Sequence, residues 1–126
     1  MPMARILVLY YSSYGHVAQL AEAIAEGVRS AGHQADIARV PETAPAEVVQ
    51  AAGFAVNAAH PVIAGAQALA DYDGIALGCP TRFGRMASQM AAFWDTAGGL
   101  WMENALVGKP AAVFTSTASQ HGGQET

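Results

Sequence analysis

The stretch Ile6-Leu7-Val8-Leu9-Tyr10-Tyr11-Ser12-Ser13-Tyr14-Gly15-His16 decides the fold of this chain. Its first five residues form a continuous apolar run with β-branched and aromatic members, which is typical of a central parallel strand buried on both faces. The run ends in a polar loop, and apolar side chains then recur at helical spacing over residues 17–28. The stretch therefore predicts a strand, a loop and a helix in series.

Strands and helices alternate along the rest of the chain. Residues 34–40 alternate polar and apolar side chains, as in a strand near a sheet edge, and Pro41 ends that run. We expect further strands at 74–78 and 111–115, helices at 46–52 and 86–97, and an irregular segment at 53–67. Gly98-Gly99 is expected to stop the last helix. The alternation predicts one α/β domain over residues 1–126, built on a doubly wound open parallel sheet.

The composition limits the range of possible functions. Hydrophobic residues make up 52% and charged residues 13%, so we expect a cofactor or a second subunit to cover some apolar surface. Six basic residues against ten acidic ones, with no Lys/Arg cluster, argue against nucleic-acid binding. The sequence shows neither a signal peptide nor an integral membrane segment, and its one cysteine, Cys79, permits no intrachain disulfide. These features predict a soluble cytoplasmic protein.

The loop Ser12-Ser13-Tyr14-Gly15-His16-Val17 offers backbone N–H groups, two hydroxyls and a helix N-terminus. Those groups suit a terminal phosphate. The loop lacks the lysine of a Walker A sequence and the three glycines of a dinucleotide fingerprint, so a monophosphate held by neutral donors is favoured. An ordinary polar turn with a capping serine explains the loop equally well.

The loop Cys79-Pro80-Thr81-Arg82-Phe83-Gly84 follows the third predicted strand and should lie at the same sheet edge. Its backbone could hydrogen-bond the edge of a planar heterocycle, and the Arg82 cation would stabilise a reduced, anionic flavin. The alternative is a surface turn with a solvated arginine and a core phenylalanine. Cys79, at a strand end before proline, is interpreted as a small buried residue and not as a nucleophile.

Other side chains give weaker signals. Tyr14, Phe83 and Trp101 could line a ring-binding space, although aromatic residues are more often core. His16 and His121 lie in loops, and no spacing of ligands suggests a metal site.

Together, these motifs, Gly98-Gly99-Leu100-Trp101 and the ending Gly122-Gly123-Gln124-Glu125 resemble the WrbA-type NAD(P)H:quinone oxidoreductases, which are flavodoxin-like proteins that bind FMN. The resemblance runs in order through the chain. It implies hydride transfer from NADH or NADPH to flavin N5 and two-electron reduction of a quinone, with no catalytic side chain. It also implies a homotetramer whose neighbouring subunits help to wall the active site.

The resemblance also implies site residues. The FMN phosphate and ribityl chain would lie at residues 12–17, with the isoalloxazine ring at residues 80–84. Tyr14 would lie near the nicotinamide and Trp101 near the quinone. A third FMN loop would comprise Ser116, Thr117, Ala118, Ser119, Gln120 and His121.

Two departures from the family pattern bear on these expectations. The third loop is poorer in glycine than in other members, and the flavodoxin-like fold continues to a fifth strand, so the sequence is expected to be truncated after its fourth strand. Two other functions are compatible with the same doubly wound sheet. A flavodoxin-type single-electron carrier would enclose its flavin between aromatic rings, and a phospho-receiver would need clustered acidic residues where Ser12 and Thr81 stand.

Overall fold

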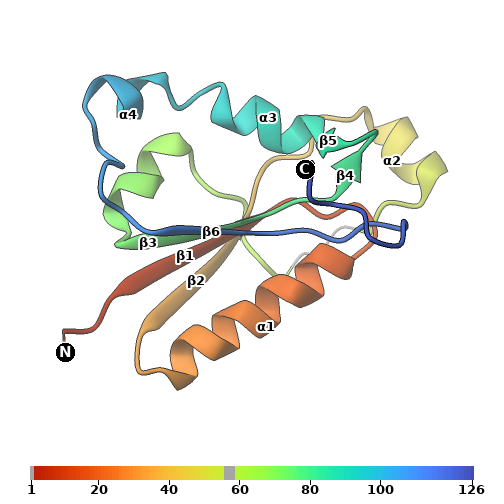
Figure 1. The fold of residues 1–126 in the computed structure, drawn as a ribbon. Helices are drawn as coiled ribbons and strands as arrows, with labels where there is room; N and C mark the ends of the chain where they lie inside the picture. The colour runs from red at the N-terminus through yellow and green to blue at the C-terminus, as the bar shows by residue number, and fades with distance from the viewer. Residues whose placement is uncertain (1, 56–58) are drawn as a thin grey trace.

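A central sheet with helices on both faces forms the protein (Figure 1). The computed structural model describes residues 2–55 and 59–126. The four-stranded main sheet contains, in spatial order, β2 (Gln34–Arg39), β1 (Arg5–Tyr10), β3 (Gly74–Gly78) and β6 (Ala111–Phe114). All three neighbouring pairs are parallel. The predicted open parallel sheet, with β2 at an edge, is confirmed.

The alternation of side chains along β1 divides the core into two parts. Leu7 and Leu9 pack with one cluster of buried residues, whereas Val8 and Tyr10 pack with another on the opposite face. Successive side chains of a strand point to opposite faces, so a continuous apolar run requires cover on both sides.

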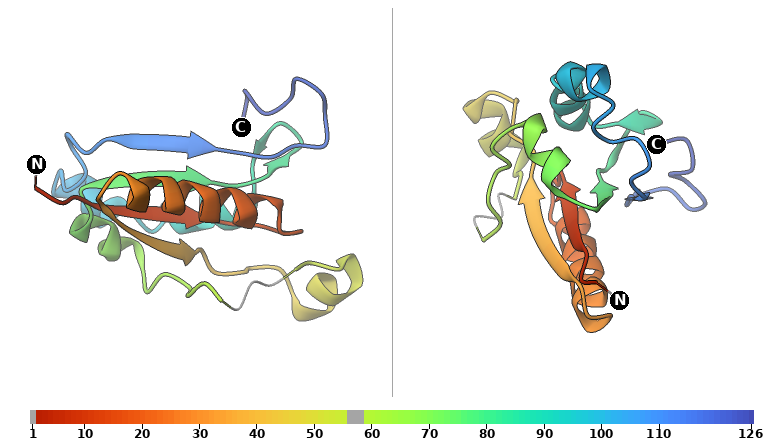
Figure 2. Two further views of the ribbon diagram at one scale, coloured as in Figure 1. Left: turned by 90° about the horizontal axis from the view of Figure 1, so that it is seen from below. Right: turned by 90° about the vertical axis from the view of Figure 1, so that its left-hand side faces the viewer.

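Helices supply that cover, as the two views in Figure 2 show. On one face α1 (His16–Ser30) packs through Val17, Ala18, Ala21 and Ala25. On the other face lie a 3₁₀ helix (Ala66–Asp71), α3 (Ser88–Trp94) and α4 (Gly98–Met102). A further helix, α2 (Ala46–Ala52), buries no residue. No helix in the described ranges is long and apolar enough to cross a membrane.

The strand order places a switch point between β1 and β3. The chain leaves β1 through α1 to reach β2 on one side, and later returns to β3 on the other side of β1. The backbone N–H of Tyr11 donates to the Gly78 oxygen at 2.9 Å, so the two strand ends remain joined where their loops begin. Ligands of open α/β sheets bind at such a point, beyond the carboxyl ends of the strands.

A short hairpin follows β3 where the sequence predicted loop and helix. The antiparallel strands β4 (Thr81–Arg82) and β5 (Arg85–Met86) are joined by Phe83 and Gly84, whose φ angles are 55° and 81°. Positive φ at both central residues is the geometry of a two-residue hairpin turn. The prediction that Met86 lies in a helix is therefore wrong, and α3 begins at Ser88.

The prediction that Gly98-Gly99 ends a helix is also wrong, because these residues begin α4. Leu100 in that helix is only 1% exposed and belongs to the same core cluster as Leu9. Burial of this one side chain stabilises the turn of helix in spite of the low helix propensity of glycine.

The predicted irregular segment at 53–67 includes residues 56–58, which lie outside the described residues. Its described part is irregular apart from a parallel bridge between Arg39 and Val62 and the start of the 3₁₀ helix at Ala66. In that bridge the Arg39 N–H donates to the Pro61 oxygen and the Ile63 N–H donates to the Arg39 oxygen, each at 2.8 Å.

Close contact across β3 and β6 makes Gly78 sensitive to substitution. A Cβ added at Gly78 would lie 2.1 Å from Cε2 of Phe114. We expect Gly78→Ala to lower the free energy of unfolding by about 1–3 kcal/mol, because the Phe114 ring must move. Gly27→Ala is the control, since a Cβ at Gly27 in α1 meets nothing within 4 Å and should stabilise by about 0.5–1 kcal/mol. Urea denaturation measures both, and equal stability of the two variants would contradict the packing.

Candidate functional site

Three loops meet at the carboxyl edge of the sheet and enclose a cavity of about 660 Å³. They follow β1, β3 and β6, the three strands whose loops the sequence singled out. The cavity is lined by Ser12, Ser13, Tyr14, His16, Val17, Pro80, Thr81, Arg82, Ser116, Thr117, Ala118 and Ser119. Gly15, Phe83, Gly84, Gln120 and His121 belong to the same loops without lining the cavity.

The first loop is built around Gly15, the residue before α1. Its φ of 97° is left-handed, which glycine adopts without a steric penalty. The Gly15 N–H donates to Ser12 Oγ at 2.9 Å, so the Ser12 hydroxyl accepts one hydrogen bond and keeps its own hydrogen to donate. No acidic residue lies in the first turn of the 15-residue helix. The free N–H groups of that turn and the helix dipole favour an anion here.

Arg82 reaches across the cleft from β4 to the first loop. Its Nη2 donates to Ser13 Oγ, and its guanidinium carbon lies 5.9 Å from the Tyr11 ring centre and 5.8 Å from that of Phe54. The alternative of a freely solvated arginine is therefore wrong. Phe83 at the turn is fully exposed, so the alternative of a core phenylalanine is wrong as well.

Thr81 provides a direct indication of a ligand. Its Oγ1 is buried and has no hydrogen-bond partner among the described residues, although it belongs to the cavity wall. Buried hydroxyls are nearly always paired, so an unpaired one suits a ligand with a polar edge. An anion site at α1, a cation at Arg82 and the unpaired hydroxyl of Thr81 fit a planar, phosphate-bearing cofactor such as FMN.

The third loop closes the cavity from the side of β6. Thr117 Oγ1 donates to the Ser119 oxygen at 3.0 Å, and the Gly122 N–H donates to the same oxygen at 3.3 Å. His121 has a left-handed φ of 59°. These local bonds shape residues 116–119 into a wall, while His121 is exposed.

Tyr14 and Trp101 occupy different parts of the molecule. Tyr14, in the cavity wall, is exposed and makes an edge-to-face contact with Phe54, with ring centres 5.5 Å apart. Trp101 lies on α4, which Figure 1 places far from the β4–β5 hairpin. Its side chain is 77% exposed beside a separate cavity. Within one chain the structure does not bring Trp101 to the cleft.

Cys79 is buried, as predicted. Burial raises the pKa of its thiol, and the hydrogen bond from the Ala87 backbone opposes this without reversing it. A thiol kept neutral is a poor nucleophile. The described ranges contain no group of three or more His, Cys, Asp or Glu side chains that could hold a metal ion.

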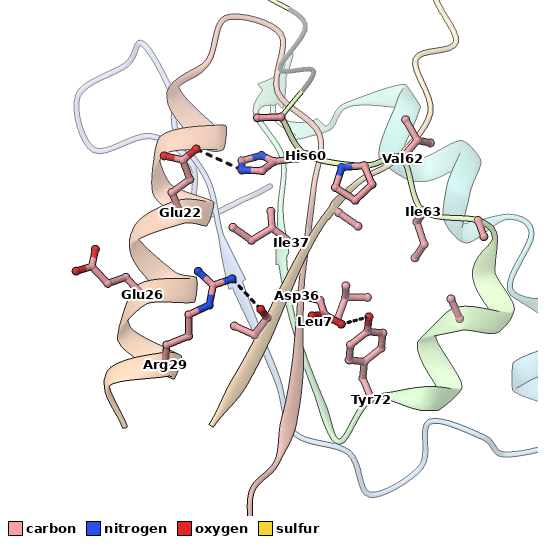
Figure 3. Close-up of a pocket in the computed structure, with 16 residues that line it drawn as sticks. Leu7, Glu22, Glu26, Arg29, Asp36, Ile37, His60, Val62, Ile63 and Tyr72 are labelled. Atoms are coloured by element: carbon pink, nitrogen blue, oxygen red, sulfur yellow. Dashed lines mark hydrogen bonds and ion pairs between the residues drawn. The ribbon is translucent and has the colours of Figure 1, made fainter. Parts of the chain in front are cut away.

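A larger hollow of about 900 Å³ runs along β2 (Figure 3). Two pairs of its polar side chains interact: His60 Nε2 lies 3.2 Å from Glu22 Oε1, and the Tyr72 hydroxyl donates to Asp36 Oδ2 at 2.7 Å. Burial is the largest cause that raises the pKa of Tyr72 to about 12, and the hydrogen bond to Asp36 is the next. Because these groups satisfy each other and lie beside the strand rather than at its carboxyl end, the smaller cleft is the better candidate site.

Sequence reasoning missed the residues behind the cleft. Glu42 Oε1 accepts from the Tyr11 hydroxyl at 2.6 Å, and Glu42 Oε2 accepts from Gln89 Nε2 at 2.6 Å. Glu42 follows β2, whose carboxyl end is at the same sheet edge as those of β1 and β3. That position was the one available signal, since the contacts join residues 31 and 47 positions apart.

Comparisons with known proteins agree with this geometry. The profile of the flavodoxin family matches residues 8–126. A protein named NAD(P)H dehydrogenase (quinone) from Gluconacetobacter diazotrophicus is 62% identical over 98% of this chain and 62% of its own length. The protein of that name from Caulobacter vibrioides is 64% identical over the same shares. The chain therefore spans 62% of the length of these curated relatives.

Solved structures show the same arrangement of elements. A WrbA-like flavodoxin from Agrobacterium tumefaciens matches with a TM-score of 0.67 and 28% identity, over 94% of this chain and 62% of that one. The flavodiiron protein from Giardia intestinalis matches with a TM-score of 0.62 and 22% identity, over 94% of this chain and 24% of that one, and so shares the fold.

The resemblance noted in the sequence is confirmed by these relatives, and so is the flavodoxin-like, doubly wound sheet. The family profile covers nearly the whole chain, and the cleft lies at the switch point between β1 and β3. The chain belongs to the flavodoxin family.

Proposed function

We propose that the cleft binds FMN and that the protein reduces quinones with electrons from NADH or NADPH. The observation that carries this proposal is the meeting of an anion site, the unpaired Thr81 hydroxyl and the Arg82 cation in one cavity at the switch point. The names of the two bacterial relatives support the reaction. FMN supplies the redox chemistry when bound, since it can accept a hydride and pass on two electrons.

The residues of the chain bind and orient the cofactor. Ser12 and the first turn of α1 hold the phosphate, while Thr81 and Arg82 face the polar edge of the ring. The arginine charge stabilises the reduced, anionic cofactor and so raises its potential. No side chain acts as a nucleophile, which agrees with the burial of Cys79.

A reductase fits the cleft better than a single-electron carrier does. Tyr14 is the one Phe, Tyr or Trp side chain among the twelve described residues that line the cavity. A ring held there keeps one face open for the nicotinamide and then the quinone, whereas a carrier encloses its flavin between aromatic side chains. Tyr14 at the rim is positioned to contact the nicotinamide.

A second subunit contributes to the part of the site that binds the quinone. Trp101, Met102 and Val107 are each more than 70% exposed around α4, an apolar surface that suits contact between copies of the chain. A homotetramer would cover this surface and bring Trp101 of one copy toward the cleft of another. The free thiol of Cys79 agrees with a cytoplasmic location.

The FMN-loaded protein should oxidise NADH or NADPH in the presence of a quinone such as benzoquinone, and much more slowly without it. The loss of absorbance of the reduced nicotinamide with time measures both rates. Loaded protein that shows no quinone-dependent oxidation would contradict the proposed reaction.

Arg82→Ala and Ser12→Ala should separate the two ends of the cofactor. Loss of the Ser12 hydroxyl removes a hydrogen bond to an anion, worth about 1.5–3 kcal/mol, so FMN should bind roughly tenfold to a hundredfold more weakly. Arg82→Ala should instead lower the potential of bound FMN. Titration and spectroelectrochemistry measure these effects. An Arg82→Ala variant that loses FMN affinity without any change of potential would contradict the assignment of Arg82 to the ring.

A further inference from the structure

A chain of hydrogen bonds runs from the cleft through two buried side chains, Ser13 and Tyr11, to the exposed residue Glu42. Arg82 donates to Ser13 Oγ, and the Ser13 hydroxyl donates to the Tyr11 phenol oxygen at 3.3 Å. The Tyr11 hydroxyl in turn donates to Glu42 Oε1 at 2.6 Å. We call Ser13, Tyr11 and Glu42 the relay.

The carboxylate at the end fixes the direction of every bond. Glu42 Oε2 accepts from Gln89 Nε2 at 2.6 Å and from the backbone N–H groups of Thr43 and Ala44 at 3.0 and 3.1 Å. An ionised carboxylate only accepts, so Tyr11 must donate to it. The phenol oxygen is then free to accept from Ser13, and Ser13 Oγ presents a lone pair to Arg82, which can only donate.

Burial makes this order costly to disturb. Ser13 is 3% exposed, Tyr11 4% and Gln89 3%. Burial raises the pKa of the Glu42 carboxyl, but its hydrogen bonds from Tyr11 and Gln89 outweigh that effect and hold the pKa below its usual value. Burial and the hydrogen bond to Glu42 raise the pKa of the Tyr11 phenol. Glu42 therefore stays charged and Tyr11 stays neutral near pH 7, as the relay requires.

The two neighbouring serines consequently differ. Ser12 Oγ accepts from the Gly15 N–H and keeps its hydrogen for a ligand in the cleft. The hydrogen of Ser13 is already donated inward to Tyr11, so this side chain has no hydrogen left for an anion. The role of a phosphate donor, predicted for both serines, suits the hydroxyl of Ser12 alone.

We propose that Ser13 is a positioning residue for Arg82, oriented by Tyr11 and Glu42, and that its side chain does not bind the FMN phosphate. This role rests on the proposed function, because it concerns the place of the arginine beside the ring. The relay holds the guanidinium near the rings of Tyr11 and Phe54, where its charge acts on the cofactor from a fixed point. Without Ser13 the charge remains but its place is no longer fixed.

The matched variants Ser13→Ala and Ser12→Ala test the proposal, since each removes one hydroxyl from adjacent positions and changes no charge. Ser13→Ala should lower the preference for reduced over oxidised FMN roughly threefold, about 15 mV for a two-electron couple. It should leave the ratio of FMN to riboflavin affinity unchanged. Ser12→Ala should lower that ratio and leave the potential unchanged.

A double-mutant cycle with Arg82→Ala shows whether Ser13 acts through the arginine. The potential of the Ser13→Ala/Arg82→Ala protein should equal that of Arg82→Ala alone. A purely structural role for Ser13 would instead add its effect in both backgrounds, and additivity would overturn the proposal.

Tyrosine titration tests the relay without any flavin. Glu42→Gln should lower the pKa of Tyr11. Ultraviolet absorbance follows the ionisation of the tyrosines, and the Tyr11→Phe variant shows which part of the signal belongs to Tyr11. Glu47→Gln, which removes an exposed carboxylate from the first turn of α2, should leave it unchanged. An unaltered Tyr11 pKa in Glu42→Gln would overturn the relay.

The outcomes separate the two proposals. If Ser13→Ala weakens FMN relative to riboflavin and leaves the potential unchanged, Ser13 is a phosphate ligand and only the positioning role fails. If the unmodified chain binds no FMN, the proposed function and the role of Ser13 fail together.

Discussion

The pairing of β1 with β3 is the constraint on which the site depends. β1 is buried on both faces and carries β2 on one side, so β3 must pair along its other side. This reversal of direction leaves the two strand ends adjacent, and the hydrogen bond from the Tyr11 N–H to the Gly78 oxygen joins them. The loops that follow the two strands therefore begin side by side, and they form walls of the cleft.

Each loop then contributes what its local geometry permits. Left-handed Gly15 turns the chain into α1 and exposes the helix N-terminus. Left-handed Phe83 and Gly84 fold residues 81–86 into a hairpin, which directs Arg82 toward the first loop. Glu42, beyond the end of β2, adds an anchoring carboxylate behind the cleft. The site is therefore a set of polar groups collected at one sheet edge, where the carboxyl ends of parallel strands meet.

The sequence predicted the parts of the fold that rest on strong periodicity. β1, α1, β2 and β3 could be located because apolar side chains recur with a clear period or run. The hairpin could not, because phenylalanine is seldom found at positive φ, and Gly84 marks a turn without showing that short strands flank it. α4 was missed because the burial of Leu100 outweighs the weak helix propensity of two glycines.

The same division holds for the site. The three loops were predictable because the carboxyl ends of parallel strands share one edge. The hydrogen bonds behind them were not, since Tyr11 and Glu42 are distant in sequence and each resembles an ordinary residue beside a strand. Trp101 was assigned to the quinone by resemblance, and one chain does not bring it to the cleft.

Affinity for FMN and riboflavin tests the account most directly. The two ligands share the ring and differ in the phosphate, so their affinities for the purified chain isolate the anion site at α1. The account predicts one FMN per chain, bound roughly a hundredfold to ten-thousandfold more tightly than riboflavin, as two charge-assisted hydrogen bonds would give. Equal affinities, or no binding of FMN, would contradict it.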